Sequence, residues 1–264
     1  MMNYYATKLV KGTVRRNSML YKTNVEYGDY AMTPVVGCAH GCMYPCYQMS
    51  GRIMHKQTKD RDEWIGPVLV ENTLELLQKE LPRLKSKIKF VTLSFATDPF
   101  MFLYPQIASM SLAAISLINS YNIPCMIITK GVLPYDLTRF SKDNFYGITV
   151  TGLEPDYVAY MEPGAAPVPS RIHSLKVLHD AGCRTFVSIE PFVTPNIYPV
   201  NLNALLESIS FVDHIIFGRL TKNALVSQYP NYKEFYNEKV REVINFCQAR
   251  GITYYIKDKT FTEF

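Results

Sequence analysis

Three cysteines lie close together in the segment GCAHGCMYPCYQ, residues 37–48. Thiolates are ligands of zinc and of iron–sulfur clusters, and in a reducing compartment clustered cysteines indicate metal binding rather than disulfides. The spacing, with three residues between successive members, therefore predicts a metal centre held by Cys38, Cys42 and Cys46. The remaining cysteines stand singly in apolar segments and are expected to be small buried hydrophobic residues: Cys125, Cys183 and Cys247.

The composition is that of an ordinary soluble globular protein. The chain has 264 residues, of which 48% are hydrophobic and 19% charged, and no disordered class fits these values. No window approaches the ~20 apolar residues that span a bilayer, and the first residues, MMNYYATKLVKG, lack the apolar core of a secretory signal. We therefore expect a cytoplasmic localisation and no membrane partner.

The net charge of the protein is concentrated in residues 1–25. This segment holds five bases and no acid, so the rest of the chain has 28 − 5 = 23 bases against 23 acids and is neutral. Two interpretations stay open, a solvated basic segment and an arm that contacts nucleic-acid phosphates. The five bases are Lys8, Lys11, Arg15, Arg16 and Lys22.

Behind this arm, β-branched or aromatic runs alternate with helical patterns. Such alternation predicts repeated βαβ units around a parallel sheet, forming a single domain over residues 26–264. Pro67 marks an expected helix start, and Gly182 and Gly251 follow expected helix ends. The expected strands are 31–37, 88–95, 124–129, 144–150, 183–190, 213–218 and 252–257. The expected helices are 67–84, 105–121, 167–181, 201–209 and 234–250.

A polar cluster follows each expected strand. In an α/β barrel, ligands and chemistry collect at the carboxyl ends of the strands. Loops are polar in any protein, but seven such clusters in register favour a site at a barrel mouth. Besides the cysteine loop, the clusters are Thr97 with Asp98, Thr129 with Lys130, Thr149 with Thr151, Glu190, Arg219, and Lys257 with Asp258.

Three thiolates are one short of the four ligands of a closed zinc site or a fully protein-ligated iron–sulfur cluster. His40 is an alternative fourth ligand for zinc, although its spacing of two residues from Cys38 and Cys42 folds poorly into a tetrahedron. A 4Fe-4S cluster held by three cysteines would instead leave one iron open to an external ligand.

On these residues the sequence resembles the radical S-adenosylmethionine (SAM) superfamily, in particular its spore-photoproduct-lyase-like branch and a group of phage-associated three-cysteine proteins. The resemblance spans roughly residues 25–258. It implies an α/β fold, a partial (β/α)6 TIM-like barrel that holds a 4Fe-4S cluster and SAM at its open end. The stretches that carry it are GCAHGCMYPCYQ, LSFATDPFMFLYP, MIITKGVLPYDL, MEPGAAPVPSRIHSLKVLHDAGC, FVSIEPFVTP and HIIFGRL.

One departure from the superfamily motif lies in the loop itself. The usual motif has two residues between its second and third cysteines, whereas this chain has three, because Pro45 stands between Tyr44 and Cys46. An extra residue shifts the third thiolate by up to ~3.5 Å unless the loop bulges to absorb it. The effect of Pro45 on the loop is therefore an open question for the structure.

The resemblance also implies roles for individual residues. Cys38, Cys42 and Cys46 would each bind an iron, and SAM would chelate the fourth iron through its amino and carboxylate groups. A compact lysine ammonium is a suitable partner for that carboxylate. The remaining implied cofactor contacts are Thr97 and Asp98 with the SAM amino group, Lys130 with its carboxylate, Thr149 or Thr151 with the ribose, and Tyr47 with adenine.

The expected function is that of an enzyme in which SAM is cleaved to a 5′-deoxyadenosyl radical that abstracts hydrogen. A nucleic-acid base is the expected substrate, as in thymine-type modification of phage or mobile-element DNA, with flavodoxin or ferredoxin as electron donor. The lyase reaction itself is not expected, because SFATDPF lacks the cysteine that serves that enzyme as hydrogen donor. Two alternatives stay open: the same chemistry on a small molecule or peptide, and a non-enzymatic zinc- or cluster-binding barrel that acts in binding or assembly.

Overall fold

The structure is a computed structural model and describes residues 6–44 and 46–262. Pro45, whose effect on the cysteine loop the sequence left open, lies outside these residues. Within them, strands form a large sheet in the order β11-β10-β9-β8-β7-β6-β3-β2. Neighbours from β3 to β11 run parallel, and β2 pairs antiparallel with β3. The bounds are β2 (Tyr21–Lys22), β3 (Tyr30–Met32), β6 (Val91–Leu93), β7 (Cys125–Thr129), β8 (Phe145–Thr149), β9 (Arg184–Phe192), β10 (His214–Arg219) and β11 (Thr253–Ile256).

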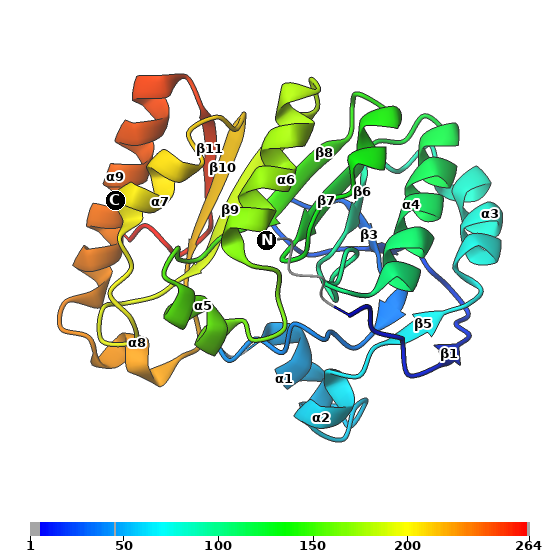
Figure 1. The fold of residues 1–264 in the computed structure, drawn as a ribbon, viewed down its shortest axis with the longest axis horizontal. Coiled ribbons are helices and arrows are strands. Elements are labelled where there is room, and N and C mark those ends of the chain that lie inside the picture. Colours follow the sequence, from blue (N-terminus) through cyan, green and yellow to red (C-terminus); the bar gives the residue numbers. More distant parts are fainter. Residues whose placement is uncertain (1–5, 45, 263–264) are drawn as a thin grey trace.

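Helices that connect these strands pack along one face of the sheet, with α3 and α4 at one end and α7 and α9 at the other (Figure 1). Their bounds are α3 (Thr73–Leu84), α4 (Pro105–Ser120), the 3-10 helix η1 (Tyr135–Arg139), α6 (Val168–Asp180), α7 (Leu202–Ser208) and α9 (Tyr232–Arg250). Four short helices gather at the edge where strands end: α1 (Tyr47–Met54), α2 (Arg61–Trp64), α5 (Pro155–Met161) and α8 (Ala224–Gln228). The predicted α/β class with a parallel sheet is confirmed.

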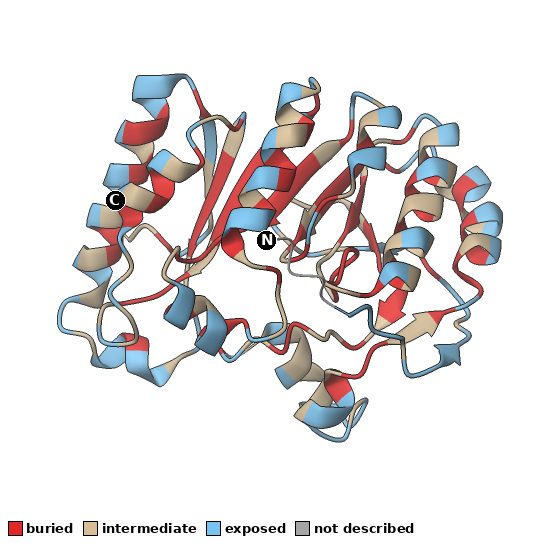
Figure 2. Cartoon of the chain, viewed as in Figure 1, coloured by how far each residue is buried: buried red, intermediate tan, exposed pale blue. Residues whose placement is uncertain are grey.

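Most of the large sheet is buried (Figure 2), and apolar clusters pack on both of its faces. Successive strand residues point to opposite faces, so neighbours such as Met126 and Ile127 enter different clusters. Ile127 belongs to the main core beneath the helices. Met126 instead packs with Phe186 and Ile216 in a separate inner cluster, against which Tyr27 and other aromatic rings lie. The sheet therefore has an inner face of its own, as expected of a partial barrel.

Glu26 and Tyr27, in the turn between β2 and β3, bring the two edges of the large sheet together. Oε2 of Glu26 accepts hydrogen bonds from the Tyr255 hydroxyl and from Asp258 N, each at 3.2 Å. The Tyr27 ring meets the rings of Tyr255 and Phe95 at centroid distances of 5.7 and 5.6 Å. No pairing of β2 with β11 is found in the described chain, so side chains rather than a strand ladder join this seam.

A smaller sheet has the order β1-β5-β4, formed by β1 (Thr13–Val14), β5 (Val68–Val70) and β4 (Val35–Val36). It corrects two expectations. The strand expected over 31–37 is divided at Pro34, which has no N–H to donate to a ladder. The helix expected over 67–84 begins only at Thr73, because 68–70 form a strand that pairs with both β1 and β4.

The basic N-terminal segment is joined to the body of the protein where the structure describes it. β1 pairs with β5, and β2 pairs with β3. Arg15 contacts the carboxylates of Glu71 at 3.4 Å and Glu75 at 2.9 Å. The division of the chain at residue 25 stays a prediction. Among the described helices, none has the length and apolar character needed to cross a membrane.

Candidate active site

The cysteine loop runs from the end of β4 to the start of α1. Cys38, Cys42 and Cys46 are partly buried and carry free thiols. Gly37 and Gly41 have positive φ angles of 82° and 57°, which a residue with a Cβ adopts only at a cost. The two glycines therefore allow the chain to turn twice within the loop.

Hydrogen bonds fix this loop to α2, to the end of α5 and to the connection between α5 and α6. They satisfy backbone groups that an irregular, partly buried segment could not pair within itself. With the donor first, they are Cys38 N to Trp64 O (2.8 Å), Met43 N to Met161 O (2.8 Å), Gly164 N to His40 O (3.0 Å) and the Arg61 Nη2 to Gly41 O (2.9 Å). The loop is thus held in place by the protein on two sides.

Gly164 approaches the cysteine loop so closely that no side chain would fit. A Cβ on this residue would lie 2.0 Å from the carbonyl oxygen of Ala39 and 3.0 Å from the Cα of His40. The segment PGAAP, residues 163–167, leads into α6, which begins at Val168. The structure adds a second role that the sequence did not reveal, as the surface on which the loop rests.

Asp98 connects the ends of β6 and β7 to the cysteine loop. Its Oδ1 accepts hydrogen bonds from the Thr129 hydroxyl at 2.6 Å and from Phe100 N at 2.9 Å. Its Oδ2 accepts from Lys130 N at 2.8 Å and lies 3.3 Å from Nδ1 of His40. Burial opposes ionisation of Asp98, but His40 and these hydrogen bonds outweigh it and lower the pKa of the carboxyl.

His40 is buried and has both ring nitrogens engaged within the protein. Nε2 accepts a hydrogen bond from Phe102 N at 3.2 Å, so the ring proton belongs on Nδ1, which faces Asp98. No lone pair of His40 is left for a metal, which removes the basis for a Cys3His zinc site. In the described chain, no three His, Cys, Asp or Glu side chains are placed to bind a single metal ion. In a 4Fe-4S cluster each thiolate binds a different iron, so the thiols need not converge on one point.

Glu162, at the end of α5, is the second buried carboxylate beside the loop. Its Oε1 accepts hydrogen bonds from the Tyr44 hydroxyl at 2.6 Å and the Thr151 hydroxyl at 3.3 Å. Its Oε2 accepts from Nη1 of Arg171 at 2.7 Å, and both of these charged side chains are almost fully buried, at 1% and 0% exposure. Burial works against ionisation of Glu162, yet Lys130 and Arg171 outweigh it and lower the pKa of this carboxyl.

Arg171 extends this network to the sheet. Its Nε donates to Ala166 O at 2.7 Å, and its Nη1 donates to Thr149 O at 3.0 Å as well as to Glu162. Neither Arg171 nor Glu162 was singled out from the sequence. A signal was present, because Arg171 falls in the apolar stripe of α6 with Val168 and Leu175. A charge at such a position requires a buried partner.

Lys130 lies between Glu162 and the cysteine loop. Its Nζ is 3.8 Å from Oε1 of Glu162 and 5.5 Å from the centre of the Tyr44 ring. Burial disfavours the charged form of Lys130, but Glu162 and the nearby acidic groups outweigh it, so its pKa is raised. The side chain is therefore a cation held beside the loop.

Most of the predicted site residues contact one another or their immediate neighbours, whereas Tyr47 lies apart from them. The hydroxyl of Thr97 contacts that of Thr33 beneath β4, and Thr151 reaches Glu162. Thr149 enters the network through its carbonyl oxygen. Tyr47 is 73% exposed, and Nζ of Lys222 lies 5.7 Å from its ring centre. The contacts of these residues with SAM stay predictions.

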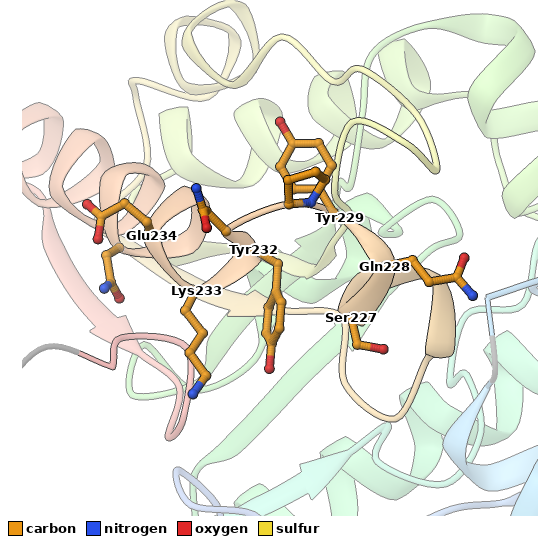
Figure 3. Close-up of a pocket in the computed structure, with 9 residues that line it drawn as sticks. Ser227, Gln228, Tyr229, Tyr232, Lys233 and Glu234 are labelled. Carbon is orange, nitrogen blue, oxygen red and sulfur yellow. The ribbon is translucent and has the colours of Figure 1, made fainter.

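A surface hollow of about 600 Å³ lies between α8 and the start of α9 (Figure 3). The side chains of Tyr232 and Lys233 extend in the same direction in this view, and the Arg219 guanidinium lies 5.9 Å from the centre of the Tyr232 ring. None of the residues predicted to bind a metal or SAM lines this hollow, so the chemistry of the cysteine loop does not extend to it.

No protein-family model matches the chain. Among curated proteins, an uncharacterized protein of the Acidianus two-tailed virus is 25% identical over 175 residues, which cover 63% of this chain. The match spans 57% of the viral protein. This similarity names no activity.

Solved structures give a broader match. A mutant of spore photoproduct lyase superposes with a TM-score of 0.69 at 14% identity, covering 94% of this chain and 82% of that chain. A double mutant of the same lyase, with bound AdoMet and dinucleoside spore photoproduct, gives a TM-score of 0.67 at 14% identity and the same coverage. At such identity the similarity establishes the fold alone. The resemblance predicted from the sequence is confirmed at that level: the chain has the radical SAM fold of the spore photoproduct lyase type.

Proposed function

We propose that the protein is a radical SAM enzyme, in which Cys38, Cys42 and Cys46 hold a 4Fe-4S cluster and S-adenosylmethionine is the second cofactor. The observation that carries this proposal is the cysteine loop itself. Three free thiols lie on one loop, which the protein fixes at the mouth of a sheet with the spore photoproduct lyase fold. The loop supplies no fourth protein ligand, because His40 is committed to Asp98 and Phe102.

The electrostatics of the thiols fit a ligand role better than a nucleophilic one. Burial raises the pKa of Cys38, and burial with Glu162 and Cys46 nearby raises the pKa of Cys42 to about 11. A reactive cysteine needs a lowered pKa, so neither thiol is poised for attack at neutral pH. A metal, by contrast, displaces the proton when it binds.

When bound, the reduced cluster supplies the electron that cleaves SAM and so generates the radical that abstracts hydrogen. The protein's own residues position the cofactors. Asp98 and Glu162 anchor the loop through His40 and Tyr44, on either side of Cys42. Lys130 would offer an ammonium to the SAM carboxylate, as the resemblance implies, and Thr97, Thr149 and Thr151 stand at the ends of β6 and β8. The barrel walls exclude water from the radical.

For the substrate, we propose a nucleic-acid base in a thymine-type modification. One neighbouring fold was solved with a dinucleoside spore photoproduct, and the N-terminal segment of this chain is basic. A base must leave its stack to reach a barrel mouth, so single-stranded or flipped nucleotides are the expected form. A flavodoxin or ferredoxin in the cytoplasm would supply the electron.

The test is metal analysis after anaerobic reconstitution. The wild-type protein is expected to hold about four irons and four sulfides per chain, with an electron paramagnetic resonance signal that SAM perturbs. Cys42→Ala should lose the cluster, whereas Cys183→Ala, at an isolated buried cysteine, should keep it. About one zinc without iron, or equal loss of iron in both variants, would exclude the proposal.

A second experiment separates cofactor binding from loop positioning. Lys130→Met should keep its iron but lose reductive cleavage of SAM to 5′-deoxyadenosine, because the carboxylate loses its cation. Asp98→Asn should lose iron as well, because its carboxylate holds His40 and the loop. Full SAM cleavage by Lys130→Met would remove this lysine from the site.

A further inference from the structure

A second group of charged residues lies at the other end of the large sheet, where β9, β10 and β11 end. Nζ of Lys257 donates a hydrogen bond of 2.5 Å to Oε1 of Glu190. Glu190 belongs to β9, and Lys257 directly follows β11, so β10 lies between them. Two strand spacings amount to roughly 10 Å, and both side chains must therefore reach across the middle strand.

Gly218 of β10 leaves the space in which they meet. A Cβ on this glycine would lie 2.9 Å from Cδ of Lys257 and 3.1 Å from Cγ of Glu190. Both distances are shorter than ordinary van der Waals contact. The ion pair thus lies directly over Gly218, and any other residue there would push the two side chains apart.

The pair faces the inside of the partial barrel. Glu190 and Gly218 follow Phe186 and Ile216 by even numbers of residues, and these two belong to the inner apolar cluster. Side chains two apart on a strand share a face. The Glu190 and Lys257 side chains are 26% and 22% exposed, so a molecule in the barrel mouth can reach them.

An aromatic surface lies beside the pair. Nζ of Lys257 is 5.8 Å from the centre of the Tyr27 ring, and this ring packs edge-on against Phe95 and Tyr255. Such rings offer flat apolar contact to a planar ligand.

Both charged groups retain hydrogen-bonding capacity. Within the described residues, the side chains of Glu190 and Lys257 form hydrogen bonds only with each other. A carboxylate accepts about four hydrogen bonds and an ammonium donates three. The Glu190 carboxylate and the Lys257 ammonium lie side by side and are partly hydrated. Each can therefore form a hydrogen bond with a ligand without leaving a buried charge unpaired.

We propose that Glu190 and Lys257, paired across Gly218, determine which substrate edge the barrel accepts. This proposal rests on the function proposed above and adds the recognition residues to it. The complementary ligand edge is an N–H next to a carbonyl on a planar ring: the N–H donates to Glu190, and the carbonyl accepts from Lys257. Thymine and uracil present this edge, whereas cytosine has an unprotonated ring nitrogen in place of the N–H.

The test measures binding of the reconstituted full chain to fluorescent single-stranded oligonucleotides by anisotropy. The probes are oligothymidine, oligocytidine, and an oligothymidine methylated at the ring nitrogen N3. The wild-type protein is expected to prefer oligothymidine over both others by about tenfold, the size of one good two-point contact with a base. Glu190→Met and Lys257→Met should abolish this preference. Gly218→Ala should weaken it while both charges remain.

The matched control is the partly exposed pair of Lys239 and Glu242 on α9, with an Nζ to Oε1 distance of 2.6 Å. Lys239→Met should keep the wild-type preference. Equal binding of the three probes by the wild-type protein would overturn the proposal, as would an unchanged preference in the Glu190 and Lys257 variants. Displacement of oligothymidine by millimolar glycine would also overturn it, because it would assign the pair to an amino acid zwitterion.

Iron content and SAM cleavage are measured on the same variants. Both are expected to match the wild type, because no contact of Glu190 or Lys257 with the described residues of the cysteine loop is found. An unchanged base preference in variants that hold iron and cleave SAM would defeat the recognition role alone. A wild-type protein without iron would defeat the proposed function, while its base preference would still test the pair.

Discussion

The two halves of the barrel mouth hold their charges in opposite ways. Beside the cysteine loop, Glu162 and Arg171 are withdrawn from solvent and bonded to several groups each. At the ends of β9 and β11, Glu190 and Lys257 are partly exposed and bonded only to each other as far as the structure describes their side chains. A buried, multiply bonded charge fixes geometry, and a hydrated pair can exchange partners. This difference is the basis on which we propose that the first half positions the cofactors and the second recognises the substrate.

The largest expected effect comes from breaking one pair in each half. Arg171→Met would leave the Glu162 carboxylate buried with Lys130 at 3.8 Å as its remaining cation in the described chain. We expect the free energy of unfolding to fall by about 3–5 kcal/mol. Lys257→Met removes a partly exposed partner and should cost about 1 kcal/mol or less. Urea unfolding of the metal-free proteins measures both, and similar losses would erase the distinction between the halves.

A smaller effect is expected from the close contact of Gly164 with the loop. Gly164→Ala places a methyl group against the Ala39 carbonyl, and overpacking of this kind costs about 1–3 kcal/mol. Because the loop must move, iron per chain after reconstitution should also fall. Gly51→Ala is the matched control: it lies in α1 with open space around it and should gain about 0.5–1 kcal/mol. Full iron occupancy in Gly164→Ala would show that this contact does not position the cysteines.

The third effect appears only in acid. The pKa of Glu162 is lowered, because Lys130 and Arg171 outweigh the cost of burial. Ionised Glu162 therefore stabilises the fold above its ordinary value of 4.5, and this contribution is lost as pH falls through the lower pKa of the folded state. The difference in unfolding free energy between the wild type and Glu162→Gln should be constant near neutral pH and shrink below 4.5. A difference that grows in acid would contradict the assigned direction.

The smallest effect concerns the basic N-terminal segment. In the structure, two of its five bases contact groups of the protein itself. Arg15 is paired with two carboxylates, and Arg16 donates to Thr33 O at 3.2 Å. Three lysines remain for phosphates, so the slope of log affinity against log salt should be at most about −2.7, rather than the −4.5 or so of five contacts. The three lysines are Lys8, Lys11 and Lys22.

Oligonucleotide titrations at two salt concentrations measure this slope. Arg15→Ala should leave it unchanged, whereas replacement of the three lysines by alanine should flatten it. A slope near that of five contacts would mean that Arg15 and Arg16 leave their partners on binding. No binding by the wild type would end the proposal that this segment recruits nucleic acid.

Local patterns in the sequence were sufficient for the parallel sheet, the cysteine loop and the polar strand ends. The periodicity of apolar residues indicates which face of a strand or helix is buried, and the polar residue types at the strand ends indicate a functional site. The pairing of Glu190 with Lys257 could not be predicted, because it depends on Gly218 of a third strand. The strand at 68–70 was missed for a related reason, since its partners β1 and β4 come from distant parts of the chain.

The contacts that hold the cysteine loop in place also could not be predicted from local sequence patterns. Gly164 indicates a close backbone contact only once Ala39 is known to lie against it. From the sequence alone, a glycine in PGAAP is explained equally well by a turn. Arg171 was the one residue with a usable signal, a charge within an apolar helix stripe. That signal requires a buried acid, but it does not identify Glu162 among the acids of the chain.

The seam formed by Glu26 has a consequence for how the protein is made. Glu26 is translated before its partners Tyr255 and Asp258, which follow 229 and 232 positions later. At about 5–20 residues per second, the ribosome takes roughly 12–46 s to cover that interval. During this time the inner face of the sheet, with Tyr27 and its aromatic neighbours, has no closing edge. A nascent chain of this protein is therefore most exposed to aggregation just before β11 emerges, and a chaperone would be of most use at that moment.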